Sequence, residues 1–130
     1  MKAFILDGPM AGRVTSLTKQ EEAMCEWEAS YCWDGLKQHK MTYFTVMTSE
    51  VQGYCIMTMH RDATERGLIN HVLNCMTEEG RGQDEIDATE LRLDSGVFTA
   101  AALETMRTMA DINLWLMRMQ QESNLKEKPH

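Results

Sequence analysis

The chain has 130 residues, of which 43% are hydrophobic and 25% charged, a composition that suits one globular domain and argues against a disordered or fibrous protein. Its 13 Lys+Arg against 20 Asp+Glu give a formal net charge of −7, which would repel a phosphate backbone, so we expect no direct binding of nucleic acid. No apolar run approaches the roughly 20 residues of a membrane span, and the first residues lack the long apolar stretch of a secretory signal. We therefore expect no membrane partner and a cytoplasmic location.

The N-terminal segment predicts a β-hairpin. Two apolar-leaning runs, residues 2–6 and 13–17, flank Asp7-Gly8-Pro9-Met10-Ala11-Gly12, whose glycines and proline are typical of a tight connection. This connection resembles the Gly-Gly-Pro-x-Asp-Gly opening of many small uncharacterised phage and prophage proteins, with Asp7 in place of the first Gly and Ala11 in place of the Asp. The resemblance implies a turn rather than any chemistry, and it suggests an accessory protein of a mobile element.

The next segment predicts a helix over residues 19–32. Thr18 and Glu21 form a capping box, and apolar residues follow at helical spacing: Ala23, Trp27 and Tyr31. Four acids fall on the expected solvent face of this helix: Glu21, Glu22, Glu26 and Glu28.

A second hairpin and a second helix are predicted in the middle of the chain. Residues 41–48 and 54–60 are rich in Thr, Tyr, Phe, Val and Ile and are separated by a short polar connection ending at Gly53. Asp62 then caps a helix, with Glu65 in the reciprocal position, and Gly80 ends it. One apolar stripe is expected to face the core: Leu68, Ile69, Val72, Leu73 and Met76.

Residues 78–94 form an acidic connector. Leu91 and Leu93 alternate with charged neighbours, so its end could pair as a short edge strand. The order Asp84-Glu85-Ile86-Asp87 does not fit a calcium loop. The acids therefore predict either a solvated loop or a surface for a basic protein partner, with these candidate residues: Glu78, Glu79, Asp84, Glu85, Asp87 and Glu90.

A long helix is predicted from about residue 97 to 122. Its first half is amphipathic, with one apolar face: Phe98, Ala102, Met106, Met109, Ile112 and Leu116. Its second half is apolar in nearly every direction, so we expect it to be covered by another copy of the chain, through Ile112, Leu114, Trp115, Met117 and Met119. The alternative is that this helix crosses the middle of its own fold. We expect residues 1–124 to form one α+β domain and residues 125–130 a flexible polar tail.

Few residues suggest chemistry. His71 and Cys75 lie one helical turn apart, but the spacing places His71 outside the apolar stripe, so we interpret it as a surface residue beside a semi-buried thiol. Cys55 and His60 could add zinc ligands, although the paired short spacings of structural zinc sites are missing. We expect four reduced cysteines and no metal or cofactor. A small-anion site would need four separated arginines to converge: Arg13, Arg61, Arg66 and Arg92.

Together these elements predict an α+β fold, an antiparallel sheet of two hairpins with four or five strands and two or three helices packed on one face. The methionines, 12 in all, are expected to fill the core, among them Met41, Met47, Met57, Met59 and Met76. The functional hypothesis is a small acidic, non-catalytic protein that inhibits a nucleic-acid-handling host or defence enzyme by binding it. Two alternatives remain open, an oligomeric protein that sequesters a small ligand or nucleotide, and a small enzyme using His71 or His60.

Overall fold

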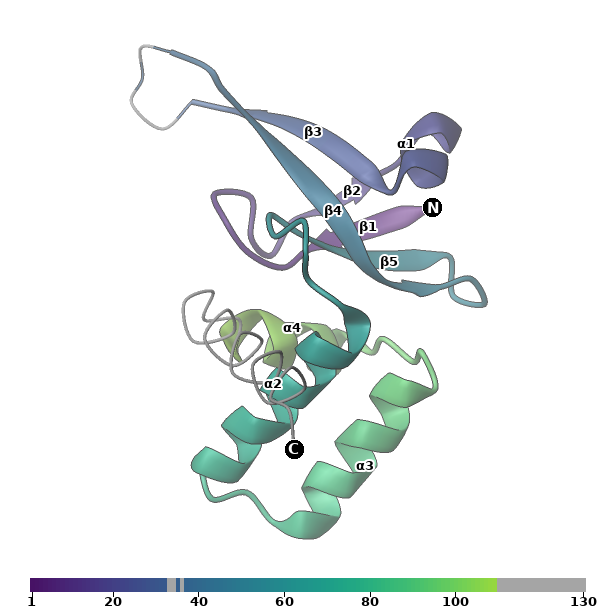
Figure 1. Cartoon of the computed structure of the whole chain (residues 1–130), viewed down its shortest axis with the longest axis vertical. Helices are drawn as coiled ribbons and strands as arrows, with labels where there is room; N and C mark the ends of the chain where they lie inside the picture. The colour runs from purple at the N-terminus through teal and green to yellow at the C-terminus, as the bar shows by residue number, and fades with distance from the viewer. Residues whose placement is uncertain (33–34, 36, 110–130) are drawn as a thin grey trace, which may run out of the picture.

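The computed structural model describes residues 1–32, 35 and 37–109. These residues form five strands and four helices, which confirms the α+β class and adds one helix to the number predicted (Figure 1). The strands are β1 (Lys2–Ile5), β2 (Val14–Ser16), β3 (Glu26–Tyr31), β4 (His39–Ser49) and β5 (Tyr54–Thr58). The helices are α1 (Lys19–Met24), α2 (Glu65–Glu78), α3 (Gln83–Asp94) and α4 (Ala100–Met109).

All five strands belong to one sheet, in the order β2-β1-β5-β4-β3. The antiparallel pairs β1–β2 and β4–β5 confirm both predicted hairpins. The prediction of a purely antiparallel sheet is wrong, because β1 and β5 join the two hairpins as a parallel pair, with Ala3 opposite Cys55. Both strands are apolar at consecutive positions and are buried on both faces, as central parallel strands usually are.

The predicted helix over residues 19–32 is wrong in its second half. Thr18 does form the capping box with Glu21, but α1 ends at Cys25, which adopts the left-handed conformation with φ 56°. The chain then continues as β3, paired with β4 from Glu26 opposite Phe44 to Tyr31 opposite His39. The four acids therefore do not share one helix face, because Glu26 and Glu28 lie on the strand.

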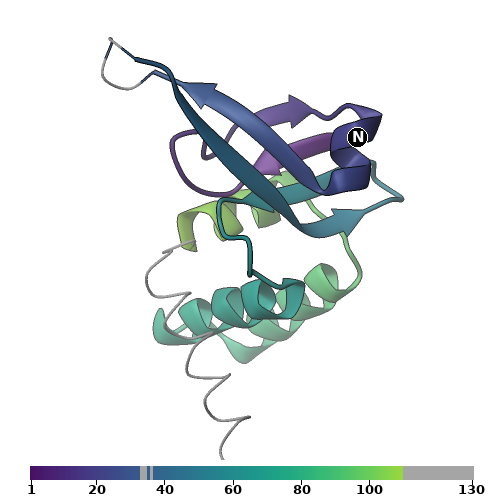
Figure 2. The ribbon, with the colours of Figure 1, turned by 45° about the horizontal axis from the view of Figure 1, so that its top comes forward.

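The two faces of the twisted sheet bury different side chains. Phe4 and Ile56 point toward the layer of α2, α3 and α4, where they meet the apolar stripe of α2. Alternate residues such as Ile5 and Met57 point to the opposite face, where they pack with Tyr43. Figure 2 shows the three helices gathered on one side of the sheet, whereas α1 lies beside β3.

The helix after β5 confirms the predicted apolar stripe but not its cap. Thr64, rather than Asp62, is the N-cap, and its side chain accepts a hydrogen bond of 3.0 Å from the amide of Gly67. Four of the five predicted stripe residues are buried and Leu73 is partly buried. The helix ends just before Gly80, as predicted.

The acidic connector is a helix, not a loop, and its end is not a strand. Residues 83–94 form α3, which packs beside α2 through the buried side chains of Ile86 and Leu93. Leu91 and Leu93 therefore do not alternate as residues of a strand. They lie on different sides of α3, where Leu93 is 1% exposed and Leu91 is 71% exposed.

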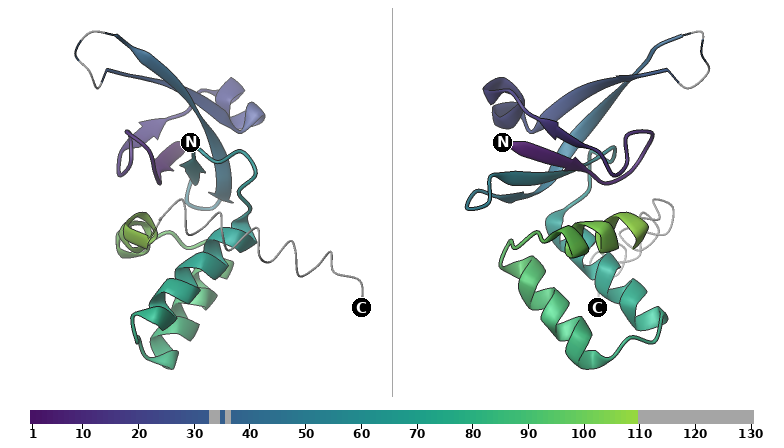
Figure 3. Two further views of the ribbon diagram at one scale, coloured as in Figure 1. Left: turned by 60° about the vertical axis from the view of Figure 1, so that its left-hand side comes forward. Right: turned by 180° about the vertical axis from the view of Figure 1, so that it is seen from behind.

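The last described helix, α4, spans ten residues and lies between the sheet and the α2–α3 pair (Figure 3). The predicted apolar face of its part of the chain is confirmed, because Phe98, Ala102, Met106 and Met109 are buried. The predicted continuation to residue 122, the polar tail and the proposed interface residues all lie outside the described residues. Among the predicted core methionines, Met59 is the exception, with 36% of its surface exposed.

Candidate functional site

The outer face of α3 carries a large exposed apolar side chain surrounded by acids. At about 100° per residue, Asp84 and Asp87 fall within roughly 40° of Leu91 around the helix axis. The buried residues Ile86 and Leu93 fall roughly 140–160° away from Leu91 on the same count. Leu91 therefore points almost directly away from the core, and its exposed surface has no cover within the described part of the chain.

The six predicted partner-binding acids all lie on the α2–α3 hairpin and are all exposed, but they do not form one surface. Glu78 and Glu79 lie at the end of α2, and Glu79 is engaged by Arg81, whose Nε donates to its carboxylate at 3.0 Å. Glu85 is turned toward the same arginine, whose terminal nitrogen donates to it at 2.9 Å. These two carboxylates, Glu85 first, raise the pKa of the Arg81 guanidinium above its ordinary value.

The remaining three acids stay available to a partner. Asp87 accepts a hydrogen bond of 2.8 Å from the side chain of Gln83, which leaves its charge uncancelled. Within the described part of the chain, no ion pair involves Asp84, Asp87 or Glu90. Asp94, which was not among the predicted residues, lies at the end of the same helix and pairs with Arg66 at 2.8 Å.

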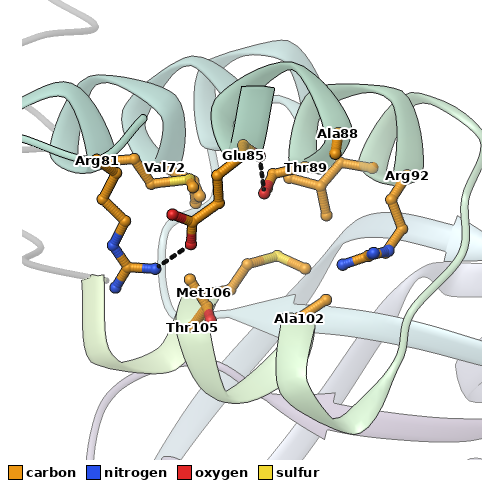
Figure 4. Close-up of a pocket in the computed structure, with 11 residues that line it drawn as sticks. Val72, Arg81, Glu85, Ala88, Thr89, Arg92, Ala102, Thr105 and Met106 are labelled. Carbon is orange, nitrogen blue, oxygen red and sulfur yellow. Dashed lines mark hydrogen bonds and ion pairs between the residues drawn. The ribbon is translucent and has the colours of Figure 1, made fainter. Parts of the chain in front are cut away.

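The inner face of α3 borders a pocket that α2 and α4 close from the other sides (Figure 4). Its volume is about 210 Å³, and its apolar wall includes Met76 and Met106. Arg81 and Arg92 stand at opposite ends, and the guanidinium of Arg92 points into the space between α3 and α4. Sequence reasoning missed this pocket because it did not predict α3, one of the three consecutive helices that build it.

His71 is buried, not exposed, which corrects the sequence prediction. It is 1% exposed because α4 covers the side of α2 on which it lies, and Nε2 is 2.5 Å from the carbonyl oxygen of Met109. A carbonyl oxygen can only accept, so Nε2 carries the proton and donates it to the last carbonyl of α4. Cys75 Sγ lies 3.7 Å from that same nitrogen, which is therefore not free to act as a base for the thiol. The geometry favours a structural contact between helices over an activated nucleophile.

A second buried polar group was missed in the sequence. Asp7 is 4% exposed and follows β1, where its carboxylate accepts hydrogen bonds from the Thr58 hydroxyl and, at 2.9 Å, from the amide of Met59. Tyr43 donates to the Asp7 carbonyl at 3.1 Å and accepts from the amide of Met10 at 3.3 Å. Burial raises the pKa of the Tyr43 hydroxyl. These hydrogen bonds connect the first turn to the ends of the parallel strands. Both carboxylate oxygens of Asp7 accept a hydrogen bond from within the fold.

The other predicted groupings are not assembled. In the part of the chain that the structure describes, the four separated arginines do not share a pocket: Arg66 pairs with Asp94, and Arg92 alone of the four lines the pocket between α2, α3 and α4. Within the described ranges, no three His, Cys, Asp or Glu side chains are placed to hold a metal ion. The helices of the described part include none long and apolar enough to cross a membrane.

Comparison of the chain with protein-family models, with curated proteins and with solved structures gave no match. The class of the protein is therefore described from its structure alone. It is an α+β protein with a mixed five-stranded sheet and a helical layer that presents an acidic face.

Proposed function

We propose that this protein is a non-catalytic binding protein that docks the outer face of α3 onto a basic surface of another protein. The observation that carries the proposal is the 71% exposure of Leu91 on the same side of α3 as Asp84 and Asp87. Protein interfaces commonly combine an apolar anchor, which supplies most of the binding energy, with a polar rim that fixes orientation. An acidic rim selects a basic partner.

The charge of the whole chain supports the same direction. A formal net charge of −7 on a small domain steers it toward positively charged surfaces and accelerates association at low ionic strength. The uncancelled carboxylates of Asp84, Asp87 and Glu90 concentrate that effect on α3. The docking should therefore weaken as salt screens these charges.

The class of partner that we propose is a nucleic-acid-handling enzyme of a host or its defence system, inhibited by this contact. Such enzymes bind phosphate backbones with clusters of Lys and Arg, which an acidic helix can also engage. The resemblance of residues 7–12 to phage and prophage proteins supports this class, because an accessory protein of a mobile element meets such enzymes in its host.

A capture experiment at two salt concentrations tests this function. Tagged wild-type protein and the double variant Asp84→Asn/Asp87→Asn are used to capture proteins from a host lysate, and the captured proteins are quantified by mass spectrometry. Glu50→Gln/Asp62→Asn is the matched control, since both acids are exposed and neither belongs to α3. We expect a basic protein that the wild type and the control retain equally at low salt, that the α3 variant retains less, and that high salt releases. Equal capture by all three proteins, or capture that salt does not change, would contradict the proposal.

A further inference from the structure

The pocket enclosed by α2, α3 and α4 lies behind the docking face and has a different chemistry. Its lining is mixed: the apolar part belongs to the edge of the core and includes Met76, Leu93 and Met106, which are each 1% exposed, and charged or polar side chains supply the rest, namely Arg81, Glu85, Thr89, Arg92 and Thr105. Methionine adapts its shape to an irregular ligand more readily than branched residues do. The apolar part of this lining can hold a hydrocarbon chain beside the charged and polar groups.

The two arginines of the pocket differ in their electrostatic state. Arg81 is neutralised by the two carboxylates that it binds, Glu79 at 3.0 Å and Glu85 at 2.9 Å. The side chain of Arg92 makes no ion pair or hydrogen bond with another described residue, and its guanidinium points into the pocket (Figure 4). One end of the pocket therefore carries an uncompensated positive charge with several donors in one plane.

From this arrangement we infer that the pocket binds a short amphipathic monocarboxylate, with its hydrocarbon chain along Met76 and Met106 and its carboxylate on Arg92. A guanidinium matches the two oxygens of a carboxylate in a bidentate pair. Thr105 also lines the pocket, toward the end that Arg81 occupies (Figure 4). Because Glu79 and Glu85 neutralise Arg81, Arg92 leaves one positive charge in the pocket, which matches a monocarboxylate better than a dianion such as a phosphate monoester.

The size of the pocket limits the ligand. Its volume of about 210 Å³ lies below the roughly 300–1,000 Å³ of sites that take drug-sized molecules, which favours a small ligand. At roughly 30 Å³ for each water-sized group, the same volume holds about seven such groups. Hexanoate, whose six carbons and two oxygens make about eight such groups, is close to this limit.

An amide NMR titration of the full chain with hexanoate tests the site and locates it. We expect chemical-shift changes at Thr89, Arg92 and Thr105, with a dissociation constant of about 1 mM for a ligand of this size. The neutral analogue hexan-1-ol should bind about tenfold more weakly, because it cannot form the charged pair with the guanidinium. This comparison needs no variant and so does not depend on the folding of one.

Variants separate the charge from the cavity. Arg92→Gln should weaken hexanoate about tenfold and leave hexan-1-ol unchanged, whereas the matched control Arg61→Gln, at an exposed position outside the pocket, should change neither. Ala88→Leu places a larger side chain on the lining at an exposed helix position and should remove binding of both ligands. Equal affinity for hexanoate and hexan-1-ol, shifts that map outside α2–α4, or no shift at about ten times the expected dissociation constant would each overturn the inference.

Discussion

The first turn of the chain offers a matched test of how tightly the Asp7 network is built. Gly8 and Gly53 adopt nearly the same backbone conformation, with φ of 71° and 69°. A Cβ atom at Gly53 would meet no atom within 4 Å, whereas a Cβ atom at Gly8 would lie 2.7 Å from the Tyr43 hydroxyl and also collide with Met59. Gly53→Ala reports only the free energy of placing an alanine in the left-handed conformation. Gly8→Ala reports that free energy together with the cost of the close contact with Tyr43 and Met59.

The free energies follow from these contacts. Both alanines must adopt a left-handed conformation, which lowers the free energy of unfolding by about 1 kcal/mol. The flexible sulfur of Met59 can move aside, but Tyr43 is 0% exposed and stacks on Trp27 with ring centroids 5.7 Å apart. Gly8→Ala must therefore disturb the two hydrogen bonds of the Tyr43 hydroxyl, at about 1 kcal/mol each. We expect Gly8→Ala to cost about 3 kcal/mol and Gly53→Ala about 1 kcal/mol.

Urea denaturation followed by tryptophan fluorescence measures the difference. With a slope of roughly 2 kcal/mol/M, a further loss of about 2 kcal/mol moves the midpoint of Gly8→Ala about 1 M below that of Gly53→Ala. Equal midpoints for the two variants would refute the idea that the Tyr43 hydroxyl fixes this turn.

Three further predictions concern other parts of the chain. Residues 112–119 are expected to associate with a second copy, so static light scattering at micromolar concentration should give more than the monomer mass, and Trp115→Glu should return the monomer; a monomeric wild type would contradict this. The buried Cys55 thiol, whose pKa burial raises, should react with iodoacetamide far more slowly than the exposed Cys25, and equal rates by mass spectrometry would refute this burial. Burial also raises the pKa of Tyr43 in the folded state, so above about pH 10 the unfolded state loses this proton first and the free energy of unfolding falls. Tyr43→Phe should show a smaller fall in urea denaturation at pH 10–11 than the wild type, and identical pH profiles would contradict it.

Local signals in the sequence predicted the elements that local interactions determine. The glycines and proline of residues 7–12 indicated the first hairpin, and the stripe of α2 indicated its buried face. The parallel pairing of β1 with β5 was not predictable in the same way, because it joins segments about 50 residues apart and leaves no mark in either turn.

Two segments were assigned wrongly because the spacing of their apolar residues fits both a helix and a strand. Trp27 lies four residues from both Ala23 and Tyr31, which fits a helix, but it also alternates with Ala29, which fits a strand. The helix ends at Cys25, which adopts a left-handed conformation, and the strand begins after it. A cysteine gives no sequence signal for that conformation. In residues 83–94 the acids obscured a helix whose apolar side consists mainly of Ile86 and Leu93.

The candidate site was predictable in composition but not in geometry. The acids of residues 78–94 were recognised, yet which of them stay unpaired depends on the position of Arg81 at the turn between α2 and α3. The exposure of Leu91 depends on which side of α3 meets α2. The burial of His71 likewise required α4, which the sequence could not place against α2.

The role of Leu91 as the apolar anchor of the docking face is the central claim, and one substitution with a matched control tests it most directly. Leu91→Gln removes the anchor without changing charge, and Val51→Gln makes a similar change at a side chain that is 100% exposed in the turn between β4 and β5. Captured protein is quantified for both variants and the wild type at low salt. We predict that Leu91→Gln loses at least tenfold in affinity for the captured partner, as removal of a central apolar anchor does, while Val51→Gln binds as the wild type. Binding by Leu91→Gln that equals that of Val51→Gln would contradict the claim.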